Sequence, residues 1–79
     1  MPLEIIREMT EFGNLQRREF SGKAVDVSPD GIGLITDVPL EPGAFIQIRH
    51  ENTVQTAQVK WMGLMDGKYR IGVLIYKDR

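Results

Sequence analysis

The sequence predicts an all-β fold, a small antiparallel β-barrel of about six strands. Two observations lead to this prediction. Short segments with alternating apolar and polar residues follow one another along the chain, and residues that favour turns separate them. No segment has an unambiguous helical period. A barrel is favoured over an open sheet because closure removes the unpaired edges.

The N-terminal segment 3–12 fits two periods, because its apolar residues alternate as in a strand and also recur at helical spacing. We interpret it as a strand. A Gly-Asn pair at 13–14 then indicates a turn, and a second extended segment is expected at 20–27. Simple alternation in that segment puts Ala24 and Asp26 on the same face.

The middle of the chain contains two strand segments and a connector. Residues 32–35 form a short apolar strand, and residues 38–43 hold two prolines and a glycine that a regular strand would not accommodate. In the following segment 44–49, Ala44, Ile46 and Ile48 alternate with Phe45, Gln47 and Arg49. This period of two indicates a strand with one face in water.

The last third of the chain has the pattern of a hairpin. Residues 53–62 alternate, and Trp61 falls on the apolar side of the alternation, so we expect it in the core. The pair Asp66-Gly67 is a strong hairpin signal when alternating runs flank it. The segment 69–75 provides the second run, with aromatic and aliphatic residues at every other position.

Length and composition indicate one domain, 1–79, of an ordinary soluble protein. The chain has 79 residues, 42% hydrophobic and 27% charged, with no cysteine to form disulfides. Charged residues near the N-terminus exclude a signal peptide, and no apolar run is long enough for insertion into a membrane. We therefore expect a cytoplasmic protein.

The charge and the chemistry-bearing residues exclude further classes of function. A net charge of −1 argues against a nucleic acid polymer as a partner, and aromatic residues are too few for an RNA-binding barrel. His50 is the only histidine, and no cysteine nucleophile is present. We predict that the protein is not an enzyme and holds no metal or cofactor.

Candidate binding residues gather around the loop 26–33. Asp26 and Ser28 can bond to nearby backbone, and Gly31 tolerates conformations that a β-carbon forbids. These residues make either a shaped binding loop or simply a hairpin connector. Arg17 and Arg18 precede the loop in the sequence and suggest a local basic spot for a compact phosphate ligand, although arginines in such a position are often only solvated.

An ordered series of motifs resembles the PilZ domain family over residues 20–76. The series is Asp-x-Ser-x-x-Gly at 26–31, then Gly-Leu-Ile-Thr, Leu-Glu-Pro-Gly-Ala-Phe-Ile-Gln-Ile, Gln-Val-Lys-Trp and Tyr-Arg-Ile-Gly-Val-Leu-Ile-Tyr. The resemblance implies a six-stranded barrel that binds cyclic di-GMP, a bacterial second messenger. It implies that Asp26, Ser28 and Gly31 read a guanine edge, while an Arg-x-x-x-Arg segment grips phosphate and stacks on guanine.

The arginine motif is incomplete in this chain. Arg17 and Arg18 are the candidates for the phosphate-gripping role, but the positions four residues later hold Ser21 and Gly22. Two hypotheses therefore stand. The first is a cyclic di-GMP receptor that relays the messenger level to a protein partner, with Arg17, Arg18, Asp26, Ser28 and Gly31 as ligand-binding residues.

The second hypothesis is a divergent PilZ-like adaptor of the pilus and motility type that binds another protein and no nucleotide. Its partner would recognise an exposed strand edge of the first or last strand, or an apolar patch formed by Met62, Leu64 and Met65. Methionines in such a patch also serve as filler at the end of a barrel.

Overall fold

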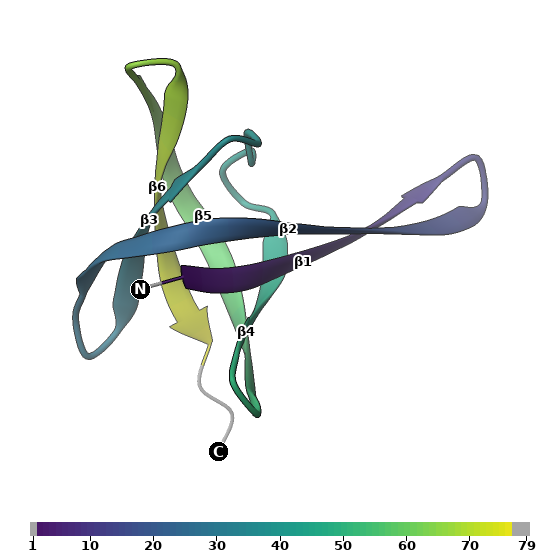
Figure 1. Ribbon diagram of the computed structural model, residues 1–79. Helices are drawn as coiled ribbons and strands as arrows, with labels where there is room; N and C mark the ends of the chain where they lie inside the picture. The colour runs from purple at the N-terminus through teal and green to yellow at the C-terminus, as the bar shows by residue number, and fades with distance from the viewer. Residues whose placement is uncertain (1, 77–79) are drawn as a thin grey trace.

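Six antiparallel strands close into a barrel in the order β1-β2-β3-β6-β5-β4, as Figure 1 shows. The computed structural model describes residues 2–76, without the side chains of residues 9–11. It confirms the predicted all-β barrel and the strand interpretation of residues 3–12. The strands are β1 (Pro2–Glu11), β2 (Asn14–Val27), β3 (Gly31–Thr36), β4 (Phe45–His50), β5 (Thr53–Met65) and β6 (Lys68–Tyr76). Within residues 2–76 there is no helix, and hence none that could cross a membrane.

Two hairpins turn through residues in the left-handed region. Phe12 and Gly13 join β1 to β2 with φ of 51° and 78°, and Asp66 and Gly67 join β5 to β6 with φ of 51° and 77°. Two-residue turns with both φ values positive match the twist of the strands they connect. The second turn confirms the prediction. The first turn lies one residue earlier than the predicted pair at 13–14.

The core lies inside the barrel and consists mainly of the inward-facing residues of all six strands. Among the side chains that the structure describes, the part of the β1–β2 hairpin that extends beyond the barrel contributes none to it. The alternation predicted for β4 and β6 is confirmed, because Ile46, Ile48, Ile71 and Val73 are all buried. Leu40, from the connector between β3 and β4, is fully buried and belongs to the same cluster of core residues.

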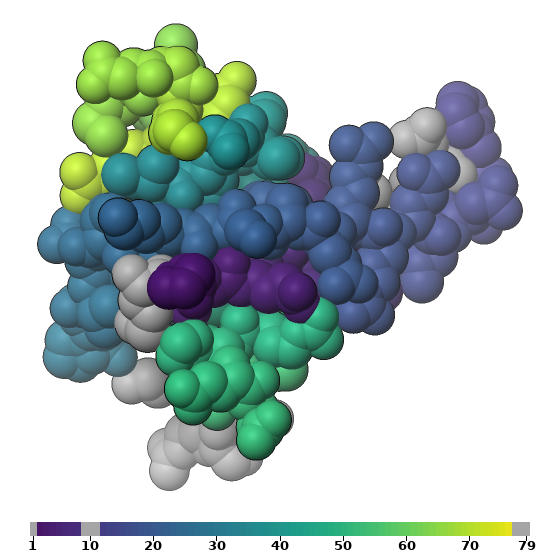
Figure 2. Space-filling view, in the orientation of Figure 1, coloured from purple at the N-terminus to yellow at the C-terminus, as the bar shows by residue number. Residues whose placement is uncertain are grey.

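The β1–β2 hairpin projects from the barrel as a two-stranded arm, residues 7–18, visible to the right in Figure 1 and Figure 2. β1 pairs with β4 only at residues 4–6, and β2 pairs with β3 only from Gly22 onward. Along the arm the two strands therefore pair only with each other. Because of this extension β2 begins at Asn14 rather than near residue 20. Phe12 at the tip of the arm is 94% exposed.

The prediction that Trp61 lies in the core is wrong. The β5–β6 register shifts between Val59 and Trp61, so that Lys60 is an extra residue on β5. Val59 points into the core, whereas Trp61 pairs with Gly72 and is 50% exposed on the outer face. The bulge thus reverses the alternation on which the prediction depended. Met62 shares the inner side, where its sulfur accepts a hydrogen bond from the backbone of Leu40 at 3.3 Å.

A matching bulge interrupts β2. Its register with β3 shifts between Ala24 and Asp26, so Val25 is the extra residue. Ala24 packs against the core, while the Asp26 side chain lies on the outer surface, 73% exposed. Simple alternation predicted that Ala24 and Asp26 share a face. This prediction is wrong, because the bulge puts them on opposite faces. In an unbroken strand, the Asp26 and Trp61 side chains would point into the barrel. Each bulge turns one of them outward.

Candidate functional site

A cleft on the outside of the barrel contains three of the five predicted site residues. Asp26, Ser28 and Gly31 line it from the β2–β3 loop, and β5 and β6 supply Lys60, Trp61 and Arg70 from the other side. Its volume is about 370 Å³. We call this space the loop cleft.

The loop itself is held by a closed set of hydrogen bonds. The backbone N–H of Ser28 donates to the carbonyl of Gly31 at 2.9 Å, and the N–H of Gly31 donates to the Ser28 hydroxyl at 3.1 Å. The N–H of Ile75 donates to the Asp30 carbonyl at 2.8 Å and ties the loop to β6. A β-carbon on Gly31 would lie 2.5 Å from the Val73 carbonyl oxygen, so only glycine allows this contact. Ser28 and Gly31 therefore shape the loop.

One row of residues across four strands forms the floor of the loop cleft. Asp26 pairs with Gly33, Gly33 pairs with Gly72, and Gly72 pairs with Trp61. The strands of Asp26 and Trp61 are thus three strand spacings apart, about 14 Å. A β-carbon on Gly72 would lie 2.1 Å from the indole Nε1, so the indole lies directly against this glycine. The Asp26 side chain lies over Gly33 and the indole lies over Gly72, so the two side chains cover neighbouring glycines of the row.

The charged groups of the cleft are two cations and one carboxylate, Lys60, Arg70 and Asp26. Arg70 Nη2 donates to Asp26 Oδ2 at 2.7 Å. Arg70 Nε is buried and has no hydrogen-bond partner among the described residues, so one donor of the guanidinium is unused. Lys60 Nζ donates a long hydrogen bond to Gln58 Oε1 at 3.4 Å, its one hydrogen bond to the described part of the chain. The cleft therefore has an excess of positive charge.

Arg17 and Arg18 do not line the loop cleft. Both lie on the arm, and Arg18 precedes Asp26 by eight residues, about 26 Å of extended strand. Arg17 forms an ion pair with Glu19 at 3.2 Å. Arg18 stands opposite Arg7 and lines a different cavity. The structure thus brings together Asp26, Ser28 and Gly31 and places the two arginines elsewhere.

Sequence reasoning missed Lys60, Trp61 and Arg70 as members of the site. Arg70 could have been placed on the outer face, because it alternates with the inward residues of β6. Trp61 gave no such signal, since the bulge at Lys60 reverses its side. Among the side chains that the structure describes, which exclude those of residues 9–11, no group of three histidine or acidic residues is arranged to hold a metal ion.

The groups of the loop cleft suit a flat ligand with negative charge. The exposed side of the Trp61 indole offers a surface on which a planar ring can stack, and Arg70 and Lys60 offer donors to an anion. The free oxygen of Asp26 can accept a hydrogen bond from an N–H group of the ring.

Compared with known proteins, the chain matches no family model, no curated protein and no solved structure.

Proposed function

We propose that this chain is a PilZ-like regulatory domain that binds cyclic di-GMP in the loop cleft and relays its level to a protein partner. The single observation that supports the proposal most is the row Asp26–Gly33–Gly72–Trp61 with Arg70 beside it. It combines a stacking surface, a carboxylate acceptor and a cation in one cleft. Guanine is recognised by stacking and by hydrogen bonds to its edge, and phosphate is recognised by cations such as arginine.

Each group then has one role. The Asp26 carboxylate accepts hydrogen bonds from the N–H groups on the guanine edge, and the base stacks on the exposed side of the Trp61 indole. Arg70 and Lys60 bind phosphate oxygens, in place of Arg17 and Arg18, which lie on the arm. The Nη groups of Arg70 supply these donors once its pair with Asp26 opens. Ser28 and Gly31 keep the loop in shape.

Binding must compete with the Asp26–Arg70 ion pair. Both side chains are more than a third exposed, so the pair contributes at most about 1 kcal/mol and opens at low cost. Charge-assisted hydrogen bonds to a ligand contribute about 1.5–3 kcal/mol each. Loss of the Arg70 guanidinium is therefore expected to weaken binding roughly 10- to 150-fold.

Calorimetric titration with cyclic di-GMP tests the proposal, and quenching of the single tryptophan provides a second readout. We expect Arg70→Ala to weaken binding at least about tenfold. Arg17→Ala and Arg18→Ala are matched controls, because they remove the same group from the arm, and they should change the dissociation constant less than about twofold. No heat up to about 100 µM ligand rejects the proposal. Equal losses in all three variants reject the cleft as the binding site.

A second candidate function is that of an adaptor that binds a protein and no nucleotide, and the arm is the observation that favours it. The outer edge of β1 is unpaired from residue 7 onward, which leaves backbone groups available to a strand of a partner. Phe12 and Leu15 are exposed near the tip, where they stabilise no core. In the predicted patch of Met62, Leu64 and Met65, Leu64 is as exposed as Leu15, but the two methionines are less exposed than Phe12 and Leu15.

Affinity capture with the purified chain separates the two functions. An adaptor that uses the arm should lose its partner in the double variant Phe12→Ser/Leu15→Ser. It should keep the partner in Val54→Ser, which removes an exposed apolar residue near another turn. Capture that is unchanged by the double variant excludes the arm. Capture that depends on added cyclic di-GMP supports the receptor.

A further inference from the structure

A second cavity lies between the base of the arm and the connector that joins β3 to β4. Arg7, Arg18 and Phe20 line it on the strand side, and residues 38–41 line it on the connector side. Its volume is about 320 Å³, and it shares no residue with the loop cleft. We call it the connector cavity. It is independent of the function proposed above.

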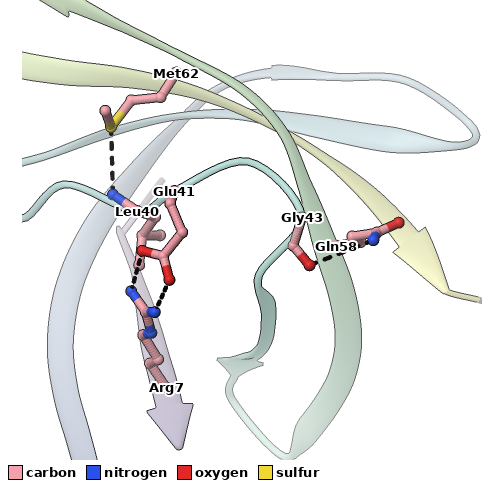
Figure 3. Close-up of polar contacts among 6 residues, drawn as sticks. All are labelled: Arg7, Leu40, Glu41, Gly43, Gln58 and Met62. Carbon is pink, nitrogen blue, oxygen red and sulfur yellow. Dashed lines mark hydrogen bonds and ion pairs between the residues drawn. The ribbon is translucent and has the colours of Figure 1, made fainter. Parts of the chain in front are cut away.

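The connector wall of this cavity is fixed by contacts to two strands, β1 and β5, as Figure 3 shows. Both Nη groups of Arg7 donate to the Glu41 carboxylate, one of them at 2.7 Å to Oε2. The Leu40 N–H donates to the Met62 sulfur at 3.3 Å. The Gly43 carbonyl accepts a hydrogen bond from the Gln58 side chain at 3.4 Å. A wall held in this way gives a cavity that exists before any ligand enters.

The apolar part of the connector cavity comes from four side chains, Phe20, Val38, Pro39 and Leu40. Leu40 is fully buried, and Phe20 packs against the core. These side chains have no polar atoms that could pair with a charged group of a ligand. The cavity is therefore a mainly apolar space whose charged groups are Arg7, Arg18 and Glu41.

The two arginines are unequal. Arg7 and Arg18 stand directly opposite each other on β1 and β2, where like charges destabilise the pair. The Glu41 carboxylate takes both Nη groups of Arg7 and neutralises it. Among the residues that the structure describes, no carboxylate forms an ion pair with Arg18. One positive charge at the cavity thus remains uncompensated.

We propose that the connector cavity binds a carboxylate attached to a short aliphatic or aromatic body. The carboxylate pairs with the Arg18 guanidinium, whose planar fork matches its two oxygens. The apolar body fills the space against Phe20 and Pro39. Such a group occurs in a free carboxylic acid and at the C-terminus of a peptide that ends in an apolar residue. The ligand is the carboxylate with its apolar body, and the experiments below distinguish a free carboxylic acid from a peptide C-terminus.

The test uses the full 79-residue chain labelled with ¹⁵N, with hexanoate as the probe and hexanamide as its neutral control. We expect hexanoate to shift the amide signals of residues 38, 40 and 41 in a saturable way, with a dissociation constant on the order of 1 mM. Hexanamide should bind at least about tenfold more weakly. Equal binding of the two probes, or no saturable shift up to about 10 mM, overturns the proposal.

Two variants on one strand provide a matched pair. Arg18→Gln should weaken hexanoate binding about tenfold, whereas Arg17→Gln, on the other face of β2, should change it less than about twofold. An unchanged Arg18→Gln variant, or an equal loss in Arg17→Gln, contradicts the assignment.

A second titration identifies the source of the carboxylate. The probe is an acetylated Gly-Gly-Leu peptide with a free C-terminus, and its C-terminal amide is the control. Binding of the free peptide at least as tight as that of hexanoate, with loss in the amide, assigns the cavity to peptide C-termini. Binding of hexanoate alone assigns it to small carboxylic acids. Equal binding of peptide and amide contradicts the role of Arg18.

Discussion

Replacing Gly72 with alanine should push the single tryptophan away from the floor of the loop cleft. A β-carbon at residue 72 would lie 2.1 Å from Nε1 and 2.3 Å from Cε2 of Trp61. Carbon atoms in favourable contact are about 3.5–4.0 Å apart, so one of the two groups must move. The indole is 50% exposed, whereas Gly72 belongs to the β3–β6 and β5–β6 ladders. We therefore expect the indole to turn toward solvent and the strands to keep their pairing.

The cost follows from the surface that the indole loses. A fully buried aromatic side chain covers about 150–250 Å², so Trp61 now covers roughly half of that, about 100 Å². At about 25 cal/mol per Å², complete loss of this burial costs about 2.5 kcal/mol. Partial movement costs less, and overpacking of one methyl group usually costs about 1–3 kcal/mol. We expect a loss of about 1–2.5 kcal/mol in the free energy of unfolding.

Thermal unfolding and tryptophan fluorescence measure this effect together. For a chain of this size, each kcal/mol lowers the melting temperature by about 4–8 °C. The emission maximum of Gly72→Ala should move to longer wavelength, and acrylamide should quench the indole more strongly. Gly63→Ala is the control, since Gly63 lies on the same strand as Trp61 and a β-carbon there would meet no atom within 4 Å beyond its chain neighbours. Unchanged emission in Gly72→Ala, or an equal loss of stability in Gly63→Ala, refutes the reasoning.

Three further predictions address the core, the arm and the connector. Leu34→Ala removes a fully buried side chain and should cost about 2–5 kcal/mol in urea unfolding, so a loss below about 1 kcal/mol contradicts the placement of the core. Phe12→Asn should raise the urea midpoint, because asparagine tolerates the φ of 51° better than phenylalanine does, and a lower midpoint contradicts this. The hydrogen bonds from Arg7 hold the pKa of Glu41 below its ordinary value, so their stabilisation is present above the pKa of the unfolded chain, about 4.3, and is lost as the pH falls through the lower folded pKa. The difference in melting temperature between the wild-type chain and Glu41→Gln should therefore shrink on acidification, and a constant difference would count against the pair.

The barrel could be predicted because burial of one face imposes a period of two on the sequence. In β4 the buried residues Ile46 and Ile48 alternate with exposed or half-buried positions, and in β6 Ile71 and Val73 are the inward residues on either side of Gly72. The turn at Asp66-Gly67 was predictable from its residues alone, because they suit two positive φ values. These features depend on local sequence, which is why they needed no knowledge of the partners across the sheet.

The arm was not predictable in the same way. Residues 14–19 of β2 are all exposed, so no core-facing period marks them as a strand. They are extended because β1 pairs with them, and that pairing is a property of two segments together. The prediction therefore began the strand near Phe20, the first residue of β2 that packs against the core.

The loop cleft could not be predicted from alternation, because its position depends on two single-residue bulges. Without Val25 as an extra residue, Asp26 would follow Ala24 into the core, and without Lys60, Trp61 would follow Val59. Each bulge reverses one side chain, and the two reversed side chains are the ends of the same cross-strand row. Bulges are over-represented at barrel rims and beside active sites, and in both places they re-aim a side chain. Here the two re-aimed side chains, Asp26 and Trp61, line the same cleft, so the loop cleft depends on both bulges.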